Sequence, residues 1–501
     1  MQPAKRIRGG LPRKPLAVCL AAALALGIWE NPLAADSPSV LVRSSSSPNR
    51  AYSLTSALGD LPVGSRKRAA WEKALKFHSP KRPATTLEVT NCDDSGSGSL
   101  RDTIAGAADG DTVDMTQLTC STISVNDGAI IVAVDNLTLV GPGASALYID
   151  TRAYNQLPRS SDFYHLGTGT LEIEGLKVGG AAYAGASRPS GGCIFSEGSV
   201  ALVNSELKSC YLRPPAGTTA ASVGGGVYAA DGIYLNHSYV HYSNAYSPSS
   251  VAIGGGLYSK NGFTSKYSVI AMNAVTSGNA AAFGGAIVVA DGTTEILNTT
   301  IFGNYSDHNI GGIDILGGTS VEIANSTISG NISVNTGGGI VSAVPLTLSN
   351  STVVFNTEVT TGNYNYIVAA GVDLYNAALN AQSSLVAENL AYANPGHPFS
   401  DVGGYNATIV GANNLVRFAY LQMPGDTIYA DPLLVGLGNY GGPTPTVAIS
   451  ASSPAVNAGN NVGGFDYDQR GAGYARVIGA NADIGAFEVN SGNLIFANGF
   501  D

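Results

Sequence analysis

Short runs in which apolar and polar residues alternate recur through the middle of the chain. Residues 294–297, 321–324 and 346–349 show the pattern clearly. Alternation with a period of two over a few residues is typical of β-strands with one buried face. No stretch of comparable length repeats its apolar residues with the 3.6-residue period of a helix, so we expect helix to be a minor component.

A glycine-rich cluster precedes a short apolar run in seven successive segments, and glycine supplies 63 of the 501 residues. The clusters begin every 26 to 33 residues, at Gly191, Gly224, Gly254, Gly284, Gly311, Gly337 and Ala369. Such an elastic period is typical of a solenoid, in which outward loops vary in length while the stacked positions stay in register. A β-sandwich is the alternative.

An asparagine closes a second element in most of these repeats, and Cys210 takes its place in the first of them. Asparagines at a fixed inward turn position can form a ladder, in which each amide binds the next and no buried polar group is left without a partner. A β-sandwich gives no reason for such a recurrence. The predicted ladder consists of Asn244, Asn273, Asn304, Asn331, Asn356 and Asn389.

The N-terminus is typical of a secretory signal peptide over residues 1–35, with a basic start, an apolar run over residues 16–28 and small residues after it. A membrane anchor is the alternative, although this run is shorter than the about 20 residues that span a bilayer. No later stretch is apolar enough to span. Residues 36–86 are rich in Ser, Pro and basic residues, which predicts a linker or pro-segment; an arm that binds a membrane surface or a polyanion is the alternative.

Removal of the signal peptide would take away Cys19 and leave four cysteines in an oxidising compartment. Sequence alone allows three connectivities, as well as free buried thiols. We expect the pairs Cys92–Cys120 and Cys193–Cys210.

Several motifs resemble those of exported bacterial right-handed parallel β-helix proteins that end in a choice-of-anchor Q domain. The first coil would be residues 89–104 and 110–114, and the C-terminal motifs are residues 437–446, 453–459, 468–471 and 483–488. The resemblance implies a right-handed parallel β-helix over residues 87–400, with coils of about 26–33 residues, followed by a choice-of-anchor Q-like region over residues 401–490. It also implies export, with retention at the cell surface or release from it.

The last residues, 491–501, resemble a short tail of exported proteins from some Gram-negative bacteria. Neither a sorting signal of the LPxTG type nor a spanning segment follows the motifs. The means of attachment therefore stays open.

The net charge and the distribution of basic residues argue against several classes of function. The formal net charge of −10 argues against nucleic acid as the main partner, since phosphate binding needs an excess of Lys and Arg. No Arg lies between Arg213 and Arg417, so the central coils lack the cations that a polysaccharide lyase uses on its acidic substrate. For a glycoside hydrolase, the candidate carboxylates are Asp314 and Asp373, which share a repeat position two coils apart, at about 10 Å.

Two further candidates concern binding. Tyr228 and Tyr258 share a repeat position, and are expected either to stack as a structural column or to stand outside as a platform for sugar rings. No closed metal site is expected, although calcium is an alternative use for four aspartates near the first coil: Asp93, Asp94, Asp111 and Asp114.

These features together predict an exported surface or secreted protein, and they favour a non-enzymatic scaffold for adhesion or glycan binding over an enzyme. Its expected partner is an extracellular polysaccharide or an envelope component. The alternatives are a polysaccharide lyase or glycoside hydrolase of the pectin-lyase-like class, and a structural component of the envelope.

Overall fold

The computed structural model describes residues 84–150, 162–180, 182–183, 190–214, 219–278, 281–359, 368–392 and 399–490. The predicted signal peptide, nearly all of the predicted linker and the tail at 491–501 lie outside these residues.

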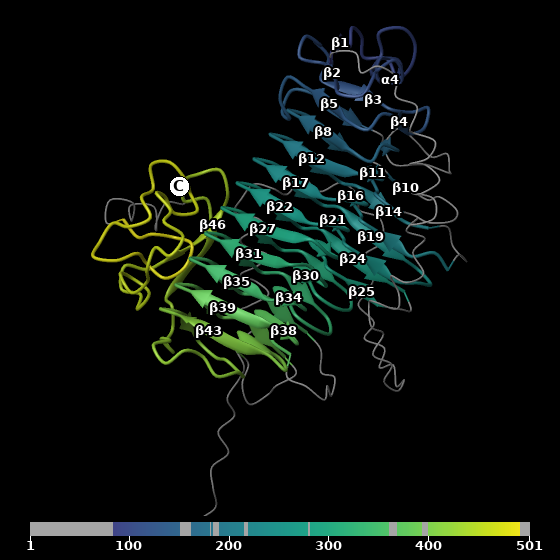
Figure 1. Ribbon diagram of the computed structural model, residues 1–501. Coiled ribbons are helices and arrows are strands. Elements are labelled where there is room, and N and C mark those ends of the chain that lie inside the picture. Colours follow the sequence, from purple (N-terminus) through teal and green to yellow (C-terminus); the bar gives the residue numbers. More distant parts are fainter. Residues whose placement is uncertain are drawn as a thin grey trace, which may run out of the picture.

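The chain winds into a parallel β-helix of about ten coils (Figure 1). Each complete coil adds one strand to each of three long sheets, in the chain order C, A, B, and every pairing between coils in these sheets is parallel. Sheet A contains β1 (Thr86–Glu88), β2 (Asp111–Asp114), β5 (Leu137–Val140), β8 (Thr170–Glu174), β12 (Ser199–Val203), β17 (Ile233–Asn236), β22 (Phe263–Lys266), β27 (Thr293–Leu297), β31 (Ser320–Ala324), β35 (Leu346–Ser349), β39 (Ala378–Gln382) and β43 (Thr408–Ala412).

Sheet B contains β3 (Thr122–Ser124), β6 (Tyr148–Asp150), β9 (Lys177–Gly179), β13 (Glu206–Lys208), β18 (Tyr239–His241), β23 (Val269–Ala271), β28 (Thr300–Phe302), β32 (Thr327–Ser329), β36 (Thr352–Val354), β40 (Leu385–Ala387) and β44 (Leu415–Val416). Sheet C contains β4 (Ile130–Val132), β7 (Phe163–His165), β11 (Ile194–Ser196), β16 (Val227–Ala229), β21 (Leu257–Ser259), β26 (Ile287–Val289), β30 (Ile313–Ile315), β34 (Ile340–Ser342), β38 (Val372–Tyr375) and β42 (Val402–Tyr405).

Two smaller parallel sheets lie between sheet B and the next strand of sheet C. Sheet D contains β10 (Ala182–Tyr183), β14 (Tyr211–Leu212), β19 (Asn244–Ser247), β24 (Ala274–Ser277), β29 (Tyr305–Ser306), β33 (Ile332–Ser333), β37 (Thr357–Glu358) and β41 (Leu390–Ala391). Sheet E contains β15 (Ser222–Val223), β20 (Ala252–Ile253) and β25 (Ala282–Phe283).

The alternation along the strands builds the main core inside the coils. In sheet B the middle residue of each three-residue strand points inward, as Leu207, Val240 and Ile270 do, and all three are fully buried. The glycine clusters form the turn into sheet C. Gly254 shows why glycine is needed there, because its φ is +67° and a Cβ would lie 2.4 Å from the Leu257 carbonyl oxygen.

A second core lies on the other face of sheet C, under sheet E. It is formed by the outward column of sheet C together with the apolar residues of sheet E: Val223, Tyr228, Ile253, Tyr258, Phe283, Val288 and Ile310. The helical content of the described residues is small, as expected: α4 (Leu100–Ala105) packs Leu100 and Ile104 against the first coils. No helix of the described residues is long and apolar enough to cross a membrane.

The solenoid ends one coil later than predicted. Strands β42, β43 and β44 form a further coil up to Val416, so the expected boundary at residue 400 falls immediately before this coil. Residues 431–490, which we call the C-terminal cover, then turn back along the outside of the solenoid. Figure 1 shows this cover, in yellow, beside the lower coils, while the upper coils lie away from it. It contains an antiparallel pair, β45 (Leu434–Gly438) and β46 (Thr446–Ile449).

Candidate functional site

A ladder of buried asparagines runs through the later coils. In each step the side-chain Nδ2 donates to Oδ1 of the next residue at 2.9 to 3.0 Å, along the series Asn273, Asn304, Asn331, Asn356, Asn389 and Asp401. The backbone N–H of each asparagine donates to the same oxygen. Asp401 ends the ladder, because its other carboxylate oxygen accepts from the Phe418 N–H at 2.8 Å.

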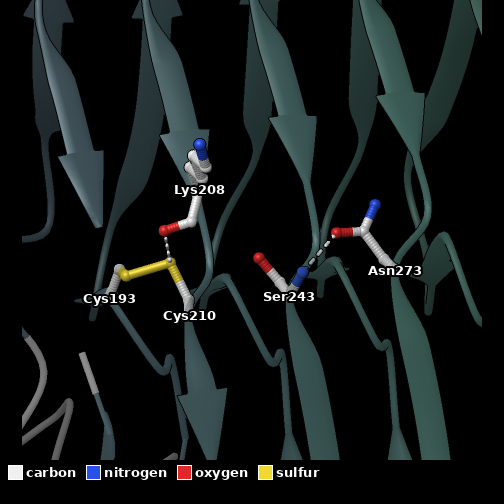
Figure 2. Close-up of a disulfide and its surroundings, with 5 residues drawn as sticks. All are labelled: Cys193, Lys208, Cys210, Ser243 and Asn273. Atoms are coloured by element: carbon white, nitrogen blue, oxygen red, sulfur yellow. Dashed lines mark hydrogen bonds between the residues drawn. A yellow bond between two sulfur atoms is a disulfide. The ribbon is translucent and has the colours of Figure 1, made fainter. Parts of the chain in front are cut away.

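One predicted member was wrong. Asn244 lies in β19, one residue beyond the ladder position, which Ser243 occupies instead (Figure 2). The Ser243 N–H donates to Asn273 Oδ1 at 2.9 Å, and Cys210 holds the corresponding position one coil earlier. The sequence pattern aligned the wrong residue because an asparagine happens to follow this serine.

Both disulfides are present, Cys92–Cys120 and Cys193–Cys210. The second lies in the core, where both cysteines are fully buried, and Figure 2 shows it in line with Ser243 and Asn273. Two disulfides indicate an oxidising environment, such as the outside of the cell.

The tyrosines proposed as a sugar platform are buried. Tyr228 is 9% exposed and Tyr258 2%, and their rings stack at 5.3 Å within the second core. The stack continues through Phe195 to Tyr164. Tyr228 and Tyr258 project from the outer face of sheet C and are buried there, so of the two alternatives they form the structural column and not the platform for sugar rings.

The candidate catalytic carboxylates also lie in the second core. Asp314 and Asp373 are 2% and 6% exposed, and Val341 stands between them in register. Burial raises the pKa of each to about 7. Sequence reasoning missed a third buried carboxyl, Glu358, whose pKa is raised to about 8 by burial and by the nearby Asp373. Carboxyl groups that are buried in this way are not accessible to a polysaccharide substrate.

The four aspartates considered for calcium all lie near the first coils, but they do not converge on one point. Asp94 pairs with Arg101 at 2.7 Å, while Asp111 and Asp114 accept hydrogen bonds from backbone N–H groups of neighbouring turns. Asp93 donates its own N–H to Asn91 Oδ1. Within the described residues no group of three or more His, Cys, Asp or Glu side chains is arranged to hold a metal ion.

The outer face of sheet B has two halves. Over β28 to β40 the C-terminal cover lies on it, and the outward residues are uncharged: Thr300, Thr327 and Thr352 form one register column, with apolar residues such as Phe302, Val354 and Leu385 around them. Gln469 of the cover joins this row, with Nε2 donating to Thr300 Oγ1 at 2.7 Å and Oε1 accepting from Thr446 Oγ1 at 3.0 Å. We call this the docked half.

Buried ion pairs within the cover hold Gln469 in place. Arg470 pairs with Asp468 at 2.5 Å and Arg476 with Glu488 at 2.9 Å, and all four side chains are essentially inaccessible. Buried charges are tolerated when they are paired and hydrogen-bonded. The C-terminal motifs singled out in the sequence therefore build the surface that docks on the solenoid.

The open half, β6 to β18, carries large and charged outward residues, and no described segment of the cover lies on it. Glu206 accepts from Lys177 Nζ and from His241 Nε2, both at 2.9 Å. Burial opposes ionisation of Glu206, but these two hydrogen bonds hold its pKa below the ordinary value. Burial lowers the pKa of His241, so its ring is neutral near pH 7 and donates from Nε2. Its Nδ1 is buried and has no partner among the described residues.

An apolar cleft of about 370 Å³ forms where the open half meets the cover. On the solenoid side it is lined by His237, Ser238, Tyr239, Tyr267, Val269 and Phe302, and on the cover side by Pro443 and Pro445. The wall of the cover is fixed, because Thr300 Oγ1 donates to the Pro445 carbonyl and Thr444 Oγ1 donates to the Asn298 carbonyl. The Tyr239 ring stacks on His241 at 3.9 Å and His237 stacks on Tyr267 at 4.9 Å.

Two of these aromatic residues, His237 and Tyr267, occupy a left-handed turn position between sheets A and B. The position has φ of 44° to 50° in six successive coils, and asparagine holds it in four of them: Asn204, His237, Tyr267, Asn298, Asn325 and Asn350. Asparagine and histidine tolerate this conformation, whereas for tyrosine it costs roughly 1–2 kcal/mol. Other bulky residues, such as Tyr242 and Phe355, are also left-handed, so the conformation alone does not mark a site. What distinguishes His237 and Tyr267 is that their rings stack on each other and line the cleft, which makes the cleft a candidate ligand site.

Sequence reasoning missed this site, although a signal was present. In each of these six coils the left-handed residue is followed by Ser or Thr, which forms a ladder of its own, for example from the Ser205 N–H to Ser238 Oγ at 3.1 Å and from the Ser238 N–H to Ser268 Oγ at 3.0 Å. Alignment on this Ser or Thr would have shown His237 and Tyr267 in place of asparagine.

Comparison of the chain with protein-family models, with curated proteins and with solved structures finds no match. A function therefore has to be inferred from the fold and the cleft.

Proposed function

We propose that this protein is an exported β-helix scaffold that binds a polysaccharide chain in the cleft between the open half of sheet B and the C-terminal cover. The observation that carries the proposal is the stacked pair of rings His237 and Tyr267, which lines the cleft and stands where neighbouring coils hold asparagine. Aromatic rings beside polar groups suit sugars, whose apolar faces pack on rings while their hydroxyls find hydrogen-bond partners.

Export is supported by the two disulfides and by the resemblance of the N-terminal and C-terminal motifs to exported proteins with a choice-of-anchor Q domain. That resemblance also favours a place at the cell surface or release from it. A scaffold is preferred to an enzyme because the candidate carboxylates Asp314 and Asp373 lie in the second core.

The test replaces Tyr267 by the residue of the next coil. Tyr267→Asn removes one wall of the cleft and relieves backbone strain, so folding is expected to be retained while affinity for a bound polysaccharide falls at least about tenfold. Binding is measured on a polysaccharide panel, with Tyr375→Asn as the control, since Tyr375 is 50% exposed on another part of the solenoid.

Unchanged binding by Tyr267→Asn would overturn the placement of the site. Release of reducing ends or of unsaturated products from the panel would instead support the enzyme alternative. A protein that binds none of the panel would favour a structural role in the envelope.

A further inference from the structure

The outer faces of sheets A and B differ in charge. Outward positions of sheet A carry a row of carboxylates and one lysine, Lys266, which is paired with Glu295 at 3.1 Å. The carboxylates are Glu88, Asp114, Glu172, Glu174, Glu295 and Glu322. The open half of sheet B holds Lys177 and Lys208 within two neighbouring strands of a protein whose net charge is −10.

Lys177 is neutralised by Glu206, which also binds His241. Lys208 is different. It stands on the outward side of β13, in register with Gly179 on one side and His241 on the other. Within the described residues its ammonium has no acidic partner, and Asp150, the other carboxylate of this column, lies a further strand away beyond Gly179.

Lys208 is partly exposed, and its neighbour in this column, Gly179, is buried and contributes no side chain. A cation without a counter-ion, on an otherwise acidic surface and beside aromatic rings, is complementary to an anionic sugar.

We propose that the polysaccharide is a polyuronate, with a sugar carboxylate held by Lys208 while the rings of neighbouring sugars pack in the cleft against Tyr239 and Tyr267. This inference rests on the proposed function. The Tyr239–His241 stack links the two parts, because His241 is the register neighbour of Lys208 and Tyr239 lines the cleft.

The experiment compares each of two polyuronates, oligogalacturonate and alginate oligomers, with its own methyl ester, which has the same backbone without the charge. Binding is measured calorimetrically for the wild type, Lys208→Gln and the control Lys266→Gln. We expect the wild type to bind at least one ionised oligomer about tenfold or more tightly than its ester, with the difference reduced at high salt.

Lys208→Gln should lose this preference but still bind the ester, and Lys266→Gln should keep it. Equal affinity for acid and ester in the wild type, or absence of binding to both polyuronates, overturns the proposal. If Tyr267→Asn still abolishes binding of a neutral polysaccharide in that case, the cleft remains the binding site and only the charge of the ligand is wrong. An unchanged preference in Lys208→Gln overturns the role of this lysine.

Discussion

The early and late coils of the solenoid share one plan but fill three of its positions differently. At the inward turn after sheet B the late coils have the asparagine ladder, whereas the early coils have Cys210 and Ser243. At the left-handed turn the late coils have asparagine, with Ser383 in one of them, and the early ones include His237 and Tyr267. On the outer face of sheet B the late coils have uncharged residues, both hydroxyl and apolar, whereas the early ones include the charged side chains of Lys177, Glu206 and Lys208.

The difference arises from the segment that covers each half. In the late coils the turn asparagines are used by the protein itself, because Asn298, Asn325 and Asn350 each donate from Nδ2 to a carbonyl of the C-terminal cover. The early coils have no such internal partner among the described residues. Where the protein covers its own surface the repeat stays regular, and where it does not, the departures from the repeat are the best indication of a ligand.

The largest effect is expected at the ladder. Asn331→Ala removes the acceptor of the Asn304 side chain and backbone and the donor to Asn356, so several buried polar groups lose partners. We expect a loss of about 2–4 kcal/mol in unfolding free energy, measured by urea denaturation.

Ser243→Ala is the matched control in the early half of the same column. Ser243 Oγ is buried and has no partner among the described residues, so its removal should change stability by less than about 0.5 kcal/mol. Equal losses in the two variants would show that the ladder is not what distinguishes the late coils.

A smaller effect is expected for the docking of the cover. Gln469→Leu leaves the hydroxyls of Thr300, Thr327 and Thr446 without their shared partner, at a cost of about 1–3 kcal/mol. Limited proteolysis should then cleave the C-terminal cover faster than in the wild type. Gln117→Leu, at an exposed position of the first coils, should leave cleavage unchanged. If Gln469→Leu resists proteolysis as well as the wild type does, the apolar contacts of the C-terminal cover are sufficient to hold it on the solenoid.

A further effect is expected at the buried carboxyls, and it depends on pH. The pKa values of Asp314 and Glu358, about 7 and about 8, exceed the ordinary carboxyl values near 4. The folded state therefore holds protons on these two groups that the unfolded state has lost, so their contribution to stability is most favourable below about pH 4 and falls as pH rises to about 8. The melting temperature should be lower at pH 8 than at pH 5.

Asp314→Val should reduce this loss and raise stability at pH 8, since valine holds the register positions on either side, at Val288 and Val341. Asp314→Asn removes the titration while keeping the shape, and should show a shallower pH dependence as well. If both variants keep the full pH dependence of the wild type, Asp314 does not titrate in this range.

Much of the fold could be predicted, because stacking forces chemically similar residues into register. The glycine clusters, the alternating runs and five of the six asparagines carry that signal directly. The packing of sheet E on the outer face of sheet C could not be predicted. Its strands β15, β20 and β25 have only two residues each, and their position over Tyr228 and Tyr258 depends on the path of the loops. Without these strands, the sequence pattern of a buried tyrosine column is the same as that of an exposed tyrosine platform.

The cleft was out of reach for a related reason. Pro443 and Pro445 are more than 170 residues from Tyr267 in the sequence and meet it only because the chain turns back after Val416. Lys208 and His241 become neighbours only once the coil register is known. Contacts of this kind come from topology, and periodicity alone does not contain them.

Hydrogen–deuterium exchange on the mature protein, with and without a saturating oligosaccharide chosen from the binding panel, tests the location of the site most directly. The account predicts slower exchange in β13, β18, β23 and the segment around Pro443 and Pro445, with the outer face of sheet A unaffected. Protection confined to sheet A or to the coils under the C-terminal cover would contradict it.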